Sequence, residues 1–128
     1  MRSIATLLFS LCFSAVFSQT DTIIFTQVSE YPYPAPFTCY TARFDALHRP
    51  FIYTANQEYG VIVFDISDVE NPKPVRTLGV SAFQNLKPTD LIQQDNYLYV
   101  SLGGFAGLAP QNAGLAVLDI SNPAGAQV

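Results

Sequence analysis

The phrase "GVIVFDIS", residues 60–67, returns as "GLAVLDIS", residues 114–121, fifty-four positions further along the chain. Successive side chains of a β-strand point to opposite faces of the sheet, so alternate letters of each phrase share a face. In both copies the two sets of letters are apolar until the aspartate near the strand end. A sheet with one face in water would alternate apolar and polar residues. We therefore expect both strands to be covered on both faces.

The sequence around the two phrases repeats as well. "FIYT" at residues 51–54 corresponds to "YLYV" at 97–100, and Asn-Pro follows each phrase, at 71–72 and 122–123. The earlier pair of segments is 46 positions apart and the two phrases are 54 positions apart. The second unit therefore carries an eight-residue insertion, which lies within residues 102–113. Two aligned units indicate an internal repeat.

Each unit is predicted to contain four short strands separated by turn residues. The first strand lies near residues 38–44 in one unit and 89–92 in the other, and a Tyr/Phe-rich strand follows. The repeated phrase is the third strand, and "VRTLGV" is the fourth, of which the second unit has only the start. Residues 22–31 are predicted as a further strand that resembles the fourth strand of a unit. Tyr, Phe, Val, Ile and Leu dominate, a composition typical of an all-β protein.

Small four-stranded sheets that are covered on both sides and repeated in tandem are typical of β-propeller blades. The sequence therefore predicts an all-β fold of tandem four-stranded antiparallel blades, with about two blades present in an incomplete ring. Because a propeller generally needs about 4–8 blades, we expect the chain to be part of a longer protein. The alternative, a complete small open domain, would leave a strand edge exposed.

The segments "GVIVFDISDVENPKPV" and "GLAVLDISNP", preceded by "FIYTA" and "YLYVSL", resemble the LVIVD repeat family over roughly residues 38–128. The resemblance implies an exported, propeller-like repeat protein whose remaining blades, in the same chain, are needed for closure. The expected organisation is a signal peptide at 1–18, a leading strand and aromatic, proline-rich connector at 19–37, a first blade at 38–87, and a truncated second blade at 88–128.

The N-terminus has the features of a secretory signal peptide. A short basic start precedes an apolar stretch, residues 4–17, which is shorter than the roughly 20 residues of a membrane-spanning helix. Val16 and Ser18 are small residues at the −3 and −1 positions of a cut before Gln19. We expect export to the extracellular space, cell surface or periplasm, with no membrane span after cleavage.

Removal of the signal peptide leaves Cys39 as the only cysteine. We expect a buried apolar thiol, and the alternative is a pairing with a partner outside this segment. The remaining chain carries five basic and ten acidic residues, a net charge of −5. There is no basic patch, so we expect no nucleic-acid partner.

The polar residues suggest structural roles. Asp65 and Asp119 occupy equivalent positions at strand ends, where a carboxylate can accept turn N–H groups. Asp68 and Glu70 could suggest a calcium site with Asp65, but the spacing and the missing glycine favour a solvated turn. His48 is the only histidine and is expected in an exposed turn. No catalytic residue, cofactor-binding residue or metal ligand is predicted.

In an antiparallel meander the connectors alternate between two ends of the sheet. One end therefore receives the second-to-third connectors and the unit-to-unit connectors, which are rich in aromatic residues and proline. Pockets favour aromatic linings with a few polar groups. Tyr33, Tyr59, Phe83 and Phe105 are predicted to form a binding face there for a protein or carbohydrate partner. Substitutions at loop positions outside the core usually change stability little, so Phe83 and Phe105 are expected to tolerate replacement by serine.

Two classes of function are compatible with these features. The first is a non-enzymatic propeller that binds or scaffolds a protein or glycan outside the cytoplasm. The alternative is an exported propeller enzyme, a hydrolase or lactonase-like protein, with its catalytic residues in further blades. One histidine and no unexplained acidic cluster favour the first class.

Overall fold

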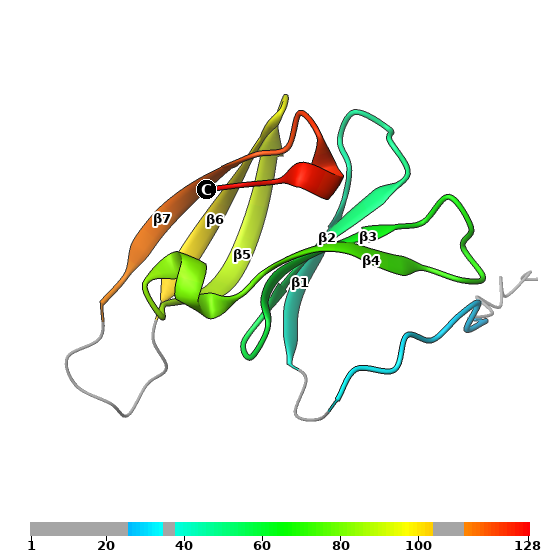
Figure 1. Cartoon of the computed structure of the whole chain (residues 1–128), viewed down its shortest axis with the longest axis horizontal. Coiled ribbons are helices and arrows are strands. Elements are labelled where there is room, and N and C mark those ends of the chain that lie inside the picture. Colours follow the sequence, from blue (N-terminus) through cyan, green and yellow to red (C-terminus); the bar gives the residue numbers. More distant parts are fainter. Residues whose placement is uncertain (1–25, 35–37, 104–111) are drawn as a thin grey trace, which may run out of the picture.

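The computed structural model in Figure 1 describes residues 26–34, 38–103 and 112–128. They form two antiparallel sheets, so the all-β prediction is confirmed. Sheet A has the order β1-β2-β3-β4, with strands Cys39–Phe44, Phe51–Asn56, Gly60–Asp65 and Lys73–Leu78. Sheet B has the order β5-β6-β7, with strands Lys87–Gln94, Tyr97–Gly103 and Gly114–Asp119. Two 3-10 helices, η1 (Val80–Phe83) and η2 (Pro123–Gly125), follow β4 and β7. No helix among these residues is long and apolar enough to cross a membrane.

The two sheets are structural copies of one another. In sheet A the β2–β3 pairing runs from Phe51 opposite Asp65 to Asn56 opposite Gly60. In sheet B the β6–β7 pairing runs over the equivalent positions, from Tyr97 opposite Asp119. The register therefore confirms the alignment of the two repeat units, with the insertion placed between β6 and β7.

The fourth strand of the second unit begins in the expected place. Asp119 forms an isolated antiparallel bridge with Gln127. In sheet A the equivalent pair, Asp65 and Lys73, opens the β3–β4 ladder. "AQV" is therefore the start of a fourth strand, as the repeat predicted.

The glycine that opens each repeated phrase serves a different purpose in each unit. Gly60 has a φ of +81°, and a Cβ there would lie 2.0 Å from the carbonyl oxygen of Leu78. Only glycine fits this close approach in a left-handed conformation. At Gly114 an added Cβ would meet only side chains, with Leu86 at 3.3 Å and Leu102 at 3.8 Å.

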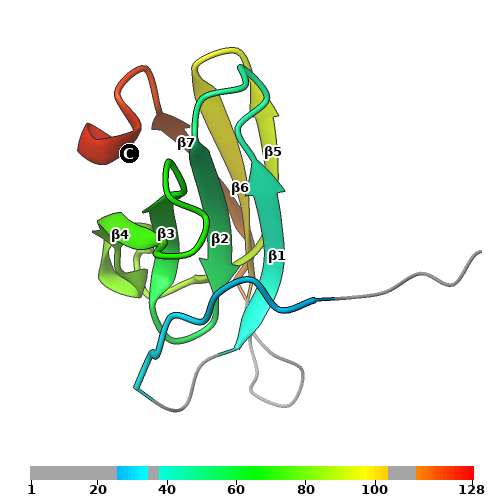
Figure 2. The same cartoon turned by 90° about the vertical axis from the view of Figure 1, so that its right-hand side faces the viewer.

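The hydrophobic core lies between the two sheets, which face one another in Figure 2. Sheet A contributes Tyr53 and Val63, and sheet B contributes Leu91, Leu98 and Leu118, all fully buried. Burying one such side chain stabilises the fold by about 1.5–3 kcal/mol. The contact between the blades therefore contributes to the stability of the fold.

The prediction that both repeated strands are covered on both faces is confirmed for β3, whereas β7 is covered on one face among the described residues. Every residue from Gly60 to Phe64 is buried. In β7 the residues facing sheet A are buried, whereas Leu115 is 65% exposed and Val117 is 41% exposed. Sheet B and Tyr31 pack on the two sides of β3, but no described element packs on the outer face of sheet B.

Two further predictions need correction. Residues 26–31, the described part of the strand predicted over 22–31, form no strand. This segment crosses the outer face of sheet A (Figure 2). Tyr31 packs there against Phe64. Cys39 was expected to be buried and is exposed, because it opens β1, the edge strand of sheet A. The predicted signal peptide lies outside the described residues.

Candidate functional site

Three tyrosines gather where the segment before β1 meets the β2–β3 turn. The ring centroids of Tyr33 and Tyr59 are 4.9 Å apart, and those of Tyr31 and Tyr33 are 5.2 Å apart. Tyr31 also meets Phe64 edge-on at 5.6 Å, which anchors the group on the outer face of sheet A. We call Tyr31, Tyr33 and Tyr59 the tyrosine cluster. Two of the residues predicted for the binding face, Tyr33 and Tyr59, are therefore brought together.

Backbone and side-chain hydrogen bonds hold the tyrosine cluster in place. The hydroxyl of Tyr59 donates to the carbonyl oxygen of Pro34 at 2.7 Å. The backbone N–H of Gln57 donates to the carbonyl of Thr38 at 2.9 Å, and the N–H of Thr38 donates to Oε2 of Glu58 at 2.8 Å. The β2–β3 turn and the chain before β1 are thus locked together, so the aromatic rings are presented by a fixed surface.

The hydroxyl of Tyr33 is partly shielded from water. Burial raises its pKa, and a hydrogen bond with the side chain of Thr77 opposes the shift without cancelling it. The phenol therefore stays protonated at neutral pH and can donate or accept a hydrogen bond. Tyrosines of this kind offer an apolar ring together with a polar tip, which is why they are enriched at interfaces.

The other two predicted residues do not join this cluster. Phe83 lies in η1, is 2% exposed and belongs to the core between the sheets. It packs with Val61 and Val63 on one face of sheet A, whereas Tyr33 meets Phe64 on the opposite face. The expectation that Phe83 can be replaced at little cost in stability is therefore wrong. Phe105 lies outside the described residues.

A pocket of about 340 Å³ adjoins η1 and β7. Its only polar side chain among the described residues is that of Gln84. The lining residues are Ala82, Phe83, Gln84, Leu86, Leu102, Ala113, Gly114, Leu115, Ala116, Val117 and Val128. A lining of this kind can receive an apolar group but offers no acid or base for catalysis.

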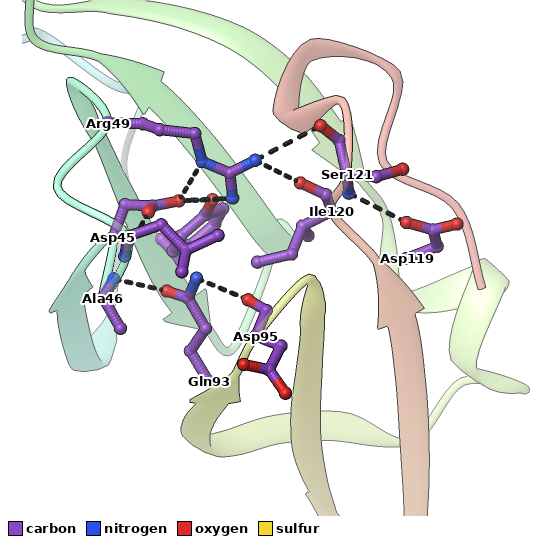
Figure 3. Close-up of polar contacts among 10 residues, drawn as sticks. Asp45, Ala46, Arg49, Gln93, Asp95, Asp119, Ile120 and Ser121 are labelled. Atoms are coloured by element: carbon purple, nitrogen blue, oxygen red, sulfur yellow. Dashed lines mark hydrogen bonds and ion pairs between the residues drawn. The ribbon is translucent and has the colours of Figure 1, made fainter.

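At the opposite end of the strands, a polar cluster connects the two blades (Figure 3). Nε and Nη2 of Arg49 donate to Oδ2 of Asp45 at 3.0 and 2.7 Å. The hydroxyl of Tyr53 donates to the same oxygen. Nη1 of Arg49 then reaches sheet B, donating to the carbonyl oxygens of Ile120 at 3.0 Å and Ser121 at 3.2 Å. We call Asp45, Arg49 and Tyr53 the inter-blade clamp.

The clamp pairs the buried Asp45 carboxylate with the partly exposed guanidinium of Arg49. Burial acts to raise the pKa of the Asp45 carboxyl, but hydrogen bonds from Arg49, Tyr53 and the N–H of Leu47 outweigh it and lower that pKa. Burial and the bond to Asp45 raise the pKa of Tyr53. Gln93 adds a second link between the blades, because its Oε1 accepts the N–H of Ala46 at 2.8 Å. These groups fix the blades relative to each other.

The aspartates at the strand ends have the structural role that the sequence predicted. Oδ1 of Asp65 accepts the N–H of Ser67 at 2.8 Å, and Oδ1 of Asp119 accepts the N–H of Ser121 at 2.8 Å. Asp68 likewise accepts the N–H of Glu70 at 3.1 Å. Within the described ranges, no group of three or more His, Cys, Asp or Glu residues is placed to hold a metal ion.

His48 is exposed in the β1–β2 turn, as predicted, with a φ of +59°. Arg49, its neighbour, was not singled out from the sequence. Its partners across the interface are backbone carbonyls, which leave no mark in sequence. Two features of the sequence could have pointed to Arg49. Asp45 and Arg49 are four residues apart, and the β1–β2 connector has six residues whereas the equivalent β5–β6 connector has two.

These features define the protein as an all-β repeat protein built from tandem antiparallel blades, an arrangement consistent with part of an open propeller ring. Residues 89–126, which span most of the second blade, match the family model described as "LVIVD repeat". The chain carries an LVIVD repeat, and the resemblance drawn from the two repeated units is confirmed. Comparison with curated proteins and with solved structures gave no match.

Proposed function

We propose that this is an exported, non-enzymatic β-propeller repeat protein that binds or scaffolds a protein or glycan outside the cytoplasm. The observation that carries the proposal is the tyrosine cluster. Its rings are held by hydrogen bonds from the turn and the preceding segment, yet Tyr31 remains exposed. A fixed group of half-exposed tyrosines suits the side chains of a protein or the faces of a sugar ring.

The ionisable residues support a binding role over catalysis. The carboxylates of Asp65, Asp68 and Asp119 are engaged by turn N–H groups, and that of Asp45 is engaged by the clamp. These groups are explained by the fold. The proposal therefore places function on the aromatic surface.

The test combines a glycan array with crosslinking to cell-envelope proteins of the producing organism. Tyr33→Ser and Tyr59→Ser are expected to weaken binding at least about tenfold, since central tyrosines often dominate an interface. Tyr59→Phe keeps the ring while removing the hydroxyl that bonds to Pro34, and it should retain most of the binding. His48→Ser, at the opposite end, is the matched control. Ligand-dependent exchange protection at residues 46–50 and 71–74 would contradict the proposal.

Export is tested separately. The features of residues 1–18 lead us to expect cleavage before Gln19. Intact-mass analysis of the protein recovered outside the cytoplasm measures the N-terminus directly. A product that still begins at Met1 and remains with the membrane would contradict export without touching the proposed binding surface.

A further inference from the structure

The β2–β3 turn of the first blade lies at the end of sheet A, beyond the faces along which blades stack. Both faces of β3 are covered, and every residue from Gly60 to Phe64 is buried. The turn residues Gln57, Glu58 and Tyr59 nevertheless stay partly exposed. Propeller blades are arranged side by side around a ring, so further blades of the same chain would cover sheet faces and leave this turn accessible.

Tyrosines from three segments meet at the turn. The hydroxyl of Tyr40, in β1, donates to Oε1 of Gln57 at 2.7 Å. The ring centroid of Tyr59 lies 4.9 Å from that of Tyr33, and the two ring planes are tilted by 57°. Because tilted rings do not stack, neither ring covers the whole face of the other. Tyr33 is partly exposed and Tyr40 is 37% exposed, so the turn carries accessible aromatic surface.

A carboxylate is held in place among these tyrosines. Oε2 of Glu58 accepts the backbone N–H of Thr38 at 2.8 Å, and Oε1 accepts the hydroxyl of Thr38 at 3.3 Å. Desolvation, together with the charge of Glu58, raises the pKa of Tyr40, so the negative charge acts on this neighbouring ring. Glu30, which precedes Tyr31 of the tyrosine cluster, is exposed and adds a second carboxylate.

The basic residues of the described ranges are placed elsewhere. Arg43, Arg49 and Arg76 donate hydrogen bonds to atoms of the second unit. Lys73 follows the β3–β4 turn, at the opposite end of β3, and Lys87 opens β5 and has a partner of its own. The β2–β3 turn and the tyrosine cluster thus combine aromatic rings with carboxylates and contain no basic residue.

We call Tyr33, Tyr40, Glu58 and Tyr59 the turn-end surface. We propose that the turn-end surface receives the cationic side chain of an arginine or lysine from a basic segment of a protein partner, an inference that rests on the proposed function and narrows it. A cation is attracted to the face of an aromatic ring within about 6 Å of its centroid. Glu58 supplies the complementary charge, which a neutral glycan would not use and which would repel an acidic partner.

The test measures the binding of two synthetic peptides to the purified full-length protein by isothermal titration calorimetry. One peptide alternates arginine with glycine, and the other alternates glutamate with glycine. The arginine peptide is expected to bind and the glutamate peptide is not. A higher salt concentration should weaken the binding, because salt screens partly exposed charges.

Glu58→Gln tests the contribution of the charge. Glutamine can still accept the N–H of Thr38, so the turn should keep its conformation. The dissociation constant of the arginine peptide should rise about threefold, as for other partly exposed ion pairs. Glu70→Gln removes the same charge from an exposed position in the β3–β4 turn. It is the matched control and should leave the dissociation constant unchanged.

Tyr59→Leu tests the contribution of the ring. Leucine keeps an apolar side chain and lacks an aromatic face, so the dissociation constant should rise about threefold. Tyr59→Phe keeps the face and should retain most of the binding, which separates the loss of the ring from the loss of the hydroxyl. If Tyr59→Leu lowers the melting temperature, Tyr33→Leu provides the second variant.

The outcomes distinguish this inference from the proposed function. If the arginine peptide does not bind, and a neutral glycan or an acidic protein binds in a manner that depends on Tyr59, the inference is overturned and the proposed function stands. If no ligand depends on Tyr33 or Tyr59, both are contradicted. Equal losses for Glu58→Gln and Glu70→Gln would also overturn the inference, because the peptide would then respond only to the net negative charge of the protein.

Discussion

Nη1 of Arg49, in the turn of the first blade, donates a hydrogen bond of 3.0 Å to the carbonyl oxygen of Ile120 at the end of β7. The two residues are 71 positions apart in the chain. The same guanidinium is held by Asp45, so one side chain connects a buried carboxylate of one blade to the backbone of the next. The contact fixes the angle between blades at the end remote from the tyrosine cluster.

Arg49→Ala is expected to destabilise the fold by about 1.5–3 kcal/mol, because hydrogen bonds to charged groups contribute at this level and Asp45 would lose its charged partner. Urea unfolding measures the change. The matched control is Arg43→Ala, whose ion pair with Asp90 is about half exposed and should contribute less than about 1 kcal/mol. Equal losses for the two variants would contradict a special role for the clamp.

The stability of the protein should fall in acid, in part because of Asp45. Its pKa in the folded state lies below the ordinary value of 3.8, so the unfolded state takes up the proton first as the pH falls. The stabilisation is present above that ordinary value and is lost as the pH falls through the folded-state pKa. Asp45→Asn should lower stability at neutral pH, and its difference from wild type should shrink between about pH 5 and pH 3. A difference that stays constant over this range, measured by urea unfolding, would rule out this coupling.

Phe83→Ala should cost about 3–5 kcal/mol, since a fully buried aromatic ring leaves a cavity between the blades. Phe64→Ala should cost a similar amount, because Phe64 is buried beneath Tyr31. Phe44→Ala removes the same side chain from an exposed position and should change stability by less than about 0.5 kcal/mol. Thermal and urea unfolding of the three variants provide the comparison, and a small effect at Phe83 would show that η1 does not close the core.

Asp65→Ala should lower the melting temperature, because it removes the acceptor for the N–H and hydroxyl of Ser67. Asp65→Asn keeps one oxygen at that position and should lose less. The equivalent pair of variants at Asp119 should behave in the same order. If Asp65→Ala leaves the melting temperature unchanged and instead abolishes a binding or catalytic activity, the structural role assigned to this residue is wrong.

The strands and their register could be predicted from the sequence because aligning the two repeat units shows which positions are equivalent. The roles of Asp65 and Asp119 were also predictable, since a carboxylate that accepts an N–H two residues later is a local feature. β7 differs from β3 in its surroundings. The apolar residues of β7 match those of β3. An apolar pattern indicates that a strand is suited to burial on both faces, but it does not supply the packing partner. Leu115 has no packing partner on the outer face among the described residues.

The candidate site was predictable only in part. Tyr33 and Tyr59 were placed together correctly because connectors alternate between the ends of a meander. Phe83 was misplaced because a connector position does not determine whether a side chain turns outward, and η1 directs this ring into the core. Arg49 was missed because its distant partners, Ile120 and Ser121, contribute backbone atoms whose position depends on the packing of whole sheets.

Asp45 and Arg49 of the clamp lie in the β1–β2 connector, which is longer than the equivalent connector of the second unit. Arg49 donates a hydrogen bond to the backbone of the second unit. Exchanging the two units along the chain would therefore preserve both sheets and their apolar faces, yet remove the contact between Arg49 and the backbone of Ile120. The two copies are thus similar enough to stack and different enough to have an order. The β1–β2 connector therefore distinguishes the first blade from the second and specifies their order along the chain.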